Sequence, residues 1–254
     1  MLQQERFVKI IEYLKANNSA RYSDLTELLN VSENTIRKDL AELDRREIVK
    51  IVRGGAVWGK INLDKGVYET RININQKEKQ ELVTCLGSII ENGQAIALNG
   101  GTTSIEVAKY LKNNYSRMTV VTNNLTVADI LKEKKNFNII IISGSYDRVE
   151  NTVIGSRAEK SLELYNTDYA ILAVNSISVE KGITDFREEE TGIINAMIRN
   201  TQKAIVAADH SKFDRVACMN ICPLSDIDCF ITDSGIDSKI LDSYRSKGYK
   251  IITP

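Results

Sequence analysis

Four short polar stretches in the second part of the chain carry side chains that could bind a ligand. They cover residues 99–104, 122–124, 143–148 and 209–213, and each follows an apolar run that predicts a β-strand. In open α/β sheets, ligands bind at the carboxyl ends of the parallel strands. If these strands share one parallel sheet, the four stretches meet at one edge, where we predict a binding site.

The stretch 99–104 has the composition of an anion site. It contains Asn99, a glycine pair that ends at Gly101, and the hydroxyls of Thr102 and Thr103, directly before a predicted helix. Glycines let the backbone approach a ligand, and the N–H groups at the start of a helix attract phosphate. The stretch has neither the G-x-G-x-x-G nor the G-K-[ST] pattern, so it does not support a dinucleotide or a P-loop nucleotide site.

The other three stretches add a mixed set of polar groups. Asn123 follows a strand, Arg148 offers a cation after a glycine, and Asp209 and Lys212 supply a carboxylate and an ammonium from one short loop. Each stretch also has a purely structural interpretation, as a tight turn, a helix cap or an exposed turn. The residue types alone leave both interpretations open.

The elements that would position these stretches alternate regularly between strand and helix. Several strands are near-continuous runs of Ile, Val and Ala, which is typical of strands covered on both faces. The alternation predicts an α/β, Rossmann-like domain with a mostly parallel sheet and right-handed crossovers. The predicted strands are 95–98, 119–122, 138–142, 169–174, 204–208, 229–232 and 250–252, and the predicted helices are 76–91, 103–113, 124–134, 154–164, 188–200 and 237–246.

Residues 31–43 predict an amphipathic helix with a polar outer face. Ser32 suits the N-cap, and Ile36, Leu40 and Leu43 recur at helical spacing on one face. The opposite face is rich in basic and hydrogen-bonding side chains, which suits insertion into a DNA major groove, although an ordinary surface helix is the alternative. The DNA contacts that we predict from this helix are Ser32, Asn34, Thr35, Arg37 and Lys38.

The segments around this helix favour the DNA-binding interpretation. Predicted helices at 3–16 and 23–29 precede it, and a short turn joins the second helix to the third, which predicts a helix-turn-helix. Residues 48–57 then alternate β-branched and basic side chains around a glycine pair, which predicts a β-hairpin wing. Lys50 and Arg53 on this wing would face the DNA phosphates.

Charge and cysteine usage limit which partners and metal sites the sequence allows. The 254 residues contain 34 basic and 34 acidic side chains, so DNA binding must come from local placement of charge. The four cysteines form no C-x-x-C pair, and we interpret them as free thiols. A zinc site from His210 with Cys218, Cys222 and Cys229 is the alternative; our prediction is no metal and no cofactor. Without an apolar run of membrane length or a signal peptide, we expect a cytoplasmic protein with no membrane partner.

The motifs together resemble the DeoR family of bacterial transcription regulators. In residues 5–57 they are Glu5-Arg6, the Val-Ser-x-x-Thr-Ile-Arg-Lys-Asp-Leu-x-x-Leu run at 31–43, and Arg-Gly-Gly-Ala at 53–56. In the second part they are Gly-Thr-Thr at 101–103, Val-Val-Thr-Asn at 120–123, Gly-Ile-Thr at 182–184, the Glu pair at 189–190, and Asp-x-Ser-Lys-Phe at 209–213.

The resemblance implies a winged helix-turn-helix joined to a domain related to ribose-5-phosphate isomerases. That domain would bind a phosphorylated sugar, which releases the regulator from DNA. The boundaries that we predict are 1–57 for the DNA-binding domain, 58–74 for a linker and 75–254 for the effector-binding and oligomerisation domain. By the resemblance, Thr102, Thr103 and Lys212 face the phosphate and Asn123, Arg148, Glu189 and Asp209 face the sugar hydroxyls; Asn99, Gly101 and Thr184 complete the predicted site.

The chain also departs from the family pattern. Glu47 replaces a usual glycine and Arg53 a usual histidine in the first part. In the second part, Asn175-Ser176 replaces Asp-Gly, Ile194 replaces a lysine, and Gly144-Ser145 replaces Gly-Gly. The lost charges at 175 and 194 suggest that the ligand differs from those usual in the family.

Our leading hypothesis is a repressor of carbohydrate-metabolism genes that acts as a non-enzymatic sensor. Because helix-turn-helix proteins read paired half-sites, we expect a homo-oligomer, a dimer or a tetramer, on double-stranded operator DNA. One alternative is a sugar-phosphate isomerase-like enzyme that uses Asp209, Lys212 and the glutamates in acid–base chemistry. A second alternative is a DNA-binding protein whose second domain only oligomerises.

Overall fold

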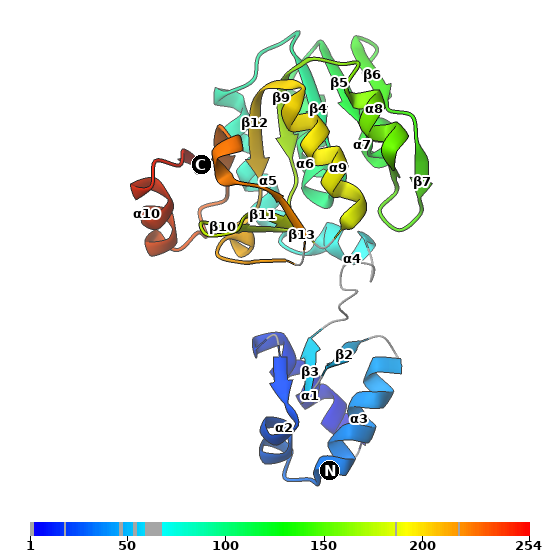
Figure 1. The fold of residues 1–254 in the computed structure, drawn as a ribbon, viewed down its shortest axis with the longest axis vertical. Coiled ribbons are helices and arrows are strands. Elements are labelled where there is room, and N and C mark those ends of the chain that lie inside the picture. Colours follow the sequence, from blue (N-terminus) through cyan, green and yellow to red (C-terminus); the bar gives the residue numbers. More distant parts are fainter. Residues whose placement is uncertain are drawn as a thin grey trace. The chain divides into compact units, whose positions relative to one another are not determined.

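The computed structural model describes residues 3–17, 19–45, 48–52, 55–58, 68–185, 187–217 and 219–254. The chain divides into two compact units, Met1–Val67 and Tyr68–Pro254 (Figure 1). Each unit has its own hydrophobic core, so each is described by itself. None of the helices in the described ranges is long and apolar enough to cross a membrane.

The first unit is a winged helix-turn-helix, as predicted. Its elements are α1 (Gln3–Asn17), β1 (Ser19–Arg21), α2 (Tyr22–Leu29), α3 (Glu33–Arg45), β2 (Val49–Val52) and β3 (Gly55–Trp58). The turn between α2 and α3 is made by Asn30, whose φ of 51° is the left-handed conformation that asparagine tolerates. Leu25, Ile36, Leu40 and Leu43 are fully buried, so the apolar faces of α2 and α3 share one core.

A buried ion pair joins the first helix to the third. Arg6 of α1 donates from Nε and Nη2 to the carboxylate of Asp39 on α3, at 2.5 Å and 3.0 Å. Gln3 adds a longer hydrogen bond of 3.3 Å to the same carboxylate. Asp39 is only 1% exposed, so removing Arg6 would leave a buried charge with too few partners. The conspicuous Arg6 and Asp39 of the sequence motif are therefore structural.

The wing contains one strand that the sequence did not predict. β2 and β3 form the predicted antiparallel hairpin, but β1 adds a third strand on the far side of β3. Three residues are too few to show an alternating pattern, which is why β1 was missed. Gly55 packs so closely against β1 that a Cβ there would lie 2.0 Å from the carbonyl oxygen of Ala20.

The second unit is built on a seven-stranded parallel sheet in the order β15-β14-β12-β9-β4-β5-β6 (Figure 1). All seven predicted strands belong to it. They are β4 (Ala95–Leu98), β5 (Met118–Thr122), β6 (Phe137–Ile141), β9 (Thr167–Leu172), β12 (Thr201–Ala207), β14 (Cys229–Ile231) and β15 (Ile251–Ile252).

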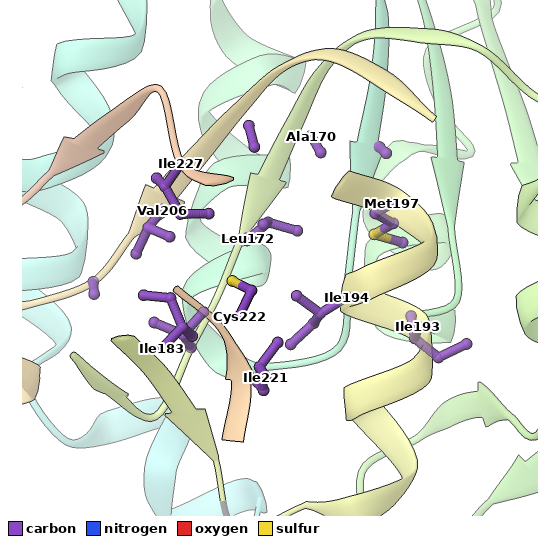
Figure 2. Packing of buried hydrophobic residues seen from close by; sticks show 14 of the residues in the cluster. Ala170, Leu172, Ile183, Ile193, Ile194, Met197, Val206, Ile221, Cys222 and Ile227 are labelled. Carbon is purple, nitrogen blue, oxygen red and sulfur yellow. The ribbon is translucent and has the colours of Figure 1, made fainter. Parts of the chain in front are cut away.

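Helices cover both faces of the sheet, as the continuous apolar strands predicted. They are α4 (Tyr68–Asn73), α5 (Gln76–Leu82), the 3-10 helix η1 (Val83–Ser88), α6 (Thr102–Asn114), α7 (Leu125–Leu131), α8 (Ser156–Leu162), α9 (Glu188–Arg199) and α10 (Ser238–Ser246). Ile96, Leu98 and Val120 pack with α6 and α7 in one core. Ala170, Leu172 and Val206 pack in the other core with Ile193, Ile194 and Met197 of α9, as Figure 2 shows.

Two small antiparallel sheets were not predicted. One contains β10 (Ser176–Ser178), β11 (Gly182–Asp185) and β13 (Met219–Cys222), and the other is the hairpin of β7 (Ser145–Asp147) and β8 (Thr152–Ile154). The short 3-10 helices η2 (His210–Lys212) and η3 (Leu224–Asp226) complete the unit. The predicted linker at 58–74 is wrong at both ends, because Trp58 lies in β3 and residues 68–73 form α4 of the second unit.

Three of the four cysteines are buried free thiols, in agreement with the sequence interpretation. They are Cys85, Cys222 and Cys229. Burial raises the pKa of Cys222 to about 12, so its thiol stays protonated and unreactive at neutral pH. Cys218, the remaining residue of the alternative zinc site, lies outside the described residues.

The close approach at Gly55 makes a prediction for stability. Gly55→Ala should lower the free energy of unfolding of the first unit by about 2 kcal/mol or more, because the added methyl overlaps backbone atoms of β1. Urea unfolding followed by the fluorescence of Trp58, the single tryptophan, measures this unit. Gly248→Ala in the second unit is the control and should leave that transition unchanged; an unchanged midpoint in Gly55→Ala would contradict the close packing.

Candidate functional site

The start of α3 presents the predicted polar face. Ser32 caps the helix by accepting a hydrogen bond of 3.3 Å from the backbone N–H of Thr35, and the two hydroxyls lie 2.9 Å apart. Asn34 and Lys38 are exposed. Ser32 and Thr35 are thus engaged in the cap, while Asn34 and Lys38 extend into solvent.

Arg37 is held in place although it lies outside the core. Its guanidinium pairs with Glu33 one turn earlier, at 2.6 Å, and lies 4.0 Å from the centre of the Tyr22 ring. Both ion-pair partners are 54% exposed, so the pair itself is weak in water. The stacking on Tyr22 orients a cation at the solvent face of α3. Of the predicted wing contacts, Lys50 lies in β2 and Arg53 lies outside the described residues.

In the second unit, the predicted stretches meet at the carboxyl edge of the central strands. Asn99 follows β4 and bonds to Ala173, the residue after β9, donating to its carbonyl at 2.9 Å and accepting from its N–H at 2.7 Å. Its side-chain amide also reaches Glu190 at 3.4 Å. Asn99 therefore fixes the spacing of two strand ends, and its free capacity for a ligand is small.

Glu190, rather than the predicted Glu189, faces this cluster. Asn123 donates to the Glu190 carboxylate at 3.0 Å, and Glu190 is 1% exposed, whereas Glu189 is exposed on the outer side of α9. Burial raises the pKa of Glu190, against the opposing effect of the Arg187 charge. Two buried oxygens nearby, Asn123 Oδ1 and Thr152 Oγ1, find no hydrogen-bond partner within the described residues. Both oxygens therefore have the capacity to accept a further hydrogen bond.

The glycine loop lies between this cluster and α6. A Cβ on Gly100 would lie 2.5 Å from a carboxylate oxygen of Glu190, and Gly101 has a φ of 131°. Only glycine fits both positions without strain. Thr102 and Thr103 then begin α6, where the N–H groups and the helix dipole favour an anion.

A buried lysine that the sequence analysis missed contacts this helix start. Lys79 of α5 is 2% exposed, and its ammonium donates to Thr102 Oγ1 at 3.3 Å and to the carbonyls of Arg71 and Ile72 at 2.7 Å and 3.1 Å. Burial lowers its pKa to about 8, with Asp209 opposing the shift. The available signal was its helical spacing, because Lys79 shares the apolar face of Leu82 in the predicted helix.

Asp209 and Lys212 lie in the loop after β12. Asp209 is buried and accepts from Asn75 Nδ2 at 2.8 Å and from the Ser211 N–H at 3.1 Å; the Ser211 hydroxyl also donates to it. Burial alone would raise the pKa of Asp209, but the Lys212 charge and these hydrogen bonds lower it. The Lys79 ammonium thus contacts the start of α6, and the charges of Asp209 and Lys212 lie near enough to act on that ammonium.

A second buried cation organises the loops behind the glycine pair. Arg187 pairs with Asp185 at 2.7 Å, lies 3.7 Å from Glu150, and donates to the carbonyl of Gly100 at 3.4 Å. Burial lowers the pKa of Arg187, but the carboxylate of Asp185 outweighs this and raises it, so Arg187 is always charged. Arg71 of α4 binds the same Glu150 at 2.5 Å.

Three of the predicted positions lie apart from these contacts. Arg148 is exposed in the turn between β7 and β8, and Glu189 is exposed on α9. Thr184 is fully buried in β11, and its hydroxyl accepts from the N–H of Ala217 at 2.8 Å. Ile194, the departure from a usual lysine, packs fully buried in the apolar core of α9 (Figure 2). The isoleucine at 194 therefore contributes to the packing of the core.

Comparison with known proteins assigns both units. Residues 6–61 match the DeoR-like helix-turn-helix domain, and residues 74–234 match the DeoR C terminal sensor domain. The chain belongs to the DeoR family. It is 31% identical over 252 residues to the transcriptional repressor GlcR of Bacillus subtilis (strain 168), covering 99% of this chain and 96% of GlcR. It is 30% identical to the glycerol-3-phosphate regulon repressor of Escherichia coli (strain K12), with 92% of each chain covered.

Solved structures superpose on part of this DeoR-family chain. A ribose 5-phosphate isomerase A from Methanocaldococcus jannaschii does so with a TM-score of 0.40 and 13% identity, over 55% of each chain. The β subunit of eIF2B from Chaetomium thermophilum does so with a TM-score of 0.47 and 12% identity, over 69% of this chain and 54% of the other. The match spans about half of either solved chain.

The lowered pKa of Lys79 makes a prediction for anion binding by the sensor domain. Sulfate affinity of the full chain should fall as the pH rises through about 8, because Lys79 loses its charge there while sulfate keeps its own. Isothermal titration calorimetry measures the affinity. Lys79→Met should weaken sulfate binding about tenfold and remove the pH step. Lys112→Met, at the opposite end of α6, is the matched control. A pH-independent affinity would exclude a charge contribution from Lys79.

Proposed function

We propose that this DeoR-family chain is a transcriptional repressor whose sensor domain binds a phosphorylated sugar. The observation that carries the proposal is the start of α6, where Lys79 contacts Thr102 beside a helix N-terminus and the charge of Lys212 lies near enough to act on Lys79. Hydroxyls, ammonium groups and helix N–H groups together match a phosphate dianion. The names of the two relatives support this proposal, because both are called repressors and one is the repressor of a glycerol-3-phosphate regulon.

The polar groups beyond the phosphate site suit sugar hydroxyls. Asn123 and Asp209 would bind hydroxyls, and Glu190 replaces Glu189 in this role because it lies among the buried polar groups. The unpaired Asn123 Oδ1 and Thr152 Oγ1 would accept hydrogen bonds from the sugar. The proposed effector site leaves out Arg148 and Thr184, which are exposed and internally bonded respectively. Asn99 and Gly101 shape the site.

The arrangement favours binding over catalysis. Both oxygens of the Glu190 carboxylate accept from amides, those of Asn99 and Asn123, and Asp209 accepts from Asn75 and Ser211. These donors orient both carboxylates, and each oxygen keeps a lone pair that can accept from a ligand hydroxyl. Because the relatives that cover nearly the whole chain are named as repressors, we propose a sensor without enzymatic activity.

The DNA-binding part of the proposal depends on the exposed face of α3. Asn34, Arg37 and Lys38 would enter the major groove, with Ser32 and Thr35 near the phosphates at the cap and Lys50 and Arg53 on the wing. Two half-sites require a homo-oligomer, and a regulator that binds operator DNA would act in the cytoplasm. By linkage, an effector that weakens DNA binding must itself bind more weakly to the DNA complex.

Operator binding with and without effectors tests the proposal. The purified chain should bind the DNA upstream of its own gene, and one member of a panel of pentose, hexose and triose phosphates should weaken that binding. Fluorescence anisotropy of labelled DNA measures the effect. The same mixtures, followed by chromatography, should show no conversion of any sugar phosphate; turnover would favour the isomerase alternative instead.

Arg37→Ala tests the recognition helix. It should weaken operator binding about ten- to a hundredfold, since a bidentate contact to a base contributes about 1–3 kcal/mol. The fold should persist, because Arg37 is exposed and belongs to no core. Arg45→Ala removes an exposed arginine from the last turn of the same helix and should have little effect. Equal affinities of the two variants would exclude Arg37 from the interface.

A further inference from the structure

Helix α4 is fastened to the sensor domain at both of its ends. At its start, the hydroxyl of Tyr68 donates to Thr126 Oγ1 of α7 at 2.9 Å, and Tyr68 is only 9% exposed. At its end, the Lys79 ammonium donates hydrogen bonds to the carbonyls of Arg71 and Ile72. A helix of six residues is not stable by itself in water, so α4 depends on these contacts.

The middle of α4 is connected to the glycine loop. Arg71 binds both carboxylate oxygens of Glu150 at 2.5 Å. Glu150 is buried and lies 3.7 Å from Arg187, which in turn donates to the Gly100 carbonyl at 3.4 Å. A chain of charged groups therefore joins α4 to the loop that precedes Thr102.

The turn after α4 contacts the loop on the other side of the proposed site. Asn75 has a φ of 51° and donates to Asp209 at 2.8 Å and to Ser211 Oγ at 3.2 Å. Two of the side chains that hold this segment, Lys79 and Asp209, are thus also ones that the phosphate and the sugar would need. In sequence, α4 is also the first described element after the winged helix-turn-helix.

We propose that α4 is a strap that effector binding releases. A phosphate is a stronger partner for an ammonium than a backbone carbonyl, so it draws Lys79 away from the carbonyls of Arg71 and Ile72. The last turn of α4 then loses two hydrogen bonds, which leaves Tyr68 and Arg71 as its attachments and raises the fraction of molecules in which the helix is released. Because α4 is the first described element after the winged helix-turn-helix in sequence, its release passes the effector signal toward the DNA-binding domain. This inference rests on the proposed function, since it requires an anion at Thr102.

The strap has a fastened and a released state, and this leads to a quantitative expectation for anion binding. If the effector binds the released state, its apparent affinity equals the intrinsic affinity multiplied by the released fraction. Weakening a contact that holds α4, without touching the anion site, raises that fraction. The apparent affinity for the anion then rises by the same factor.

Tyr68→Phe in the full chain is the test, with inorganic phosphate as the probe. The variant removes one hydrogen bond and leaves Thr126 bonded to Asn151, so phosphate should bind about fivefold more tightly than in the unchanged chain. Tyr115→Phe is the matched control, because it removes a similar buried hydroxyl contact at the opposite end of α6, to the Ile90 carbonyl. It should leave the phosphate affinity unchanged.

Hydrogen–deuterium exchange gives the second readout. Saturating phosphate should protect residues 100–104 and speed exchange over residues 68–75, at an ionic strength matched with chloride. The strap is overturned if phosphate binds the unchanged chain and Tyr68→Phe with equal affinity. It is also overturned if phosphate slows exchange over α4 or leaves it unchanged, or if phosphate has no saturable effect on either segment. A chain that shows both expected effects but ignores operator DNA would support the strap and contradict the proposed function.

Discussion

Two cations, Lys79 and Arg187, are buried in the sensor domain, and a charge removed from water must be surrounded by compensating groups. Arg187 is surrounded by Asp185, Glu150 and the Gly100 carbonyl. Lys79 donates hydrogen bonds to two carbonyls of α4 and to the hydroxyl of Thr102. Desolvated charge therefore determines how the loops at the carboxyl edge of the sheet are arranged, and the proposed site lies among these loops.

The main sheet could be predicted from the sequence because its strands are covered on both sides. Runs such as 169–174 are apolar at nearly every position, and this pattern separates them from the amphipathic helices between them. The strands that were missed have three or four residues, too few for any periodicity to appear. α4 was missed for a similar reason, since one and a half turns of polar helix resemble a linker.

The proposed site could be predicted only in part. Thr102, Asn123 and Asp209 were found because each follows a recognisable strand, and strand ends converge in a parallel sheet. Lys79 and Arg187 were not found, and the wrong member of the pair at 189–190 was chosen, because these roles come from burial and from partners far away in sequence, such as Glu150 for Arg187. The departure at Ile194 was interpreted as a lost charge of the pocket, but the side chain belongs to the apolar core. The sequence shows that a residue is charged and not whether water reaches it.

The ion pair of Arg6 and Asp39 has a consequence for how this regulator could change its target. The pair lies on the inner side of α3 and fixes the angle of that helix by contacts that never meet DNA. Asn34 and Lys38, on the outer side, are exposed and lie outside the core. In the proposed DNA-binding mode, stability and base preference thus depend on different residues of one helix. Substitutions at the outer positions can accumulate during evolution with little loss of folding, so a duplicated copy of the gene can acquire a new operator while its scaffold remains intact.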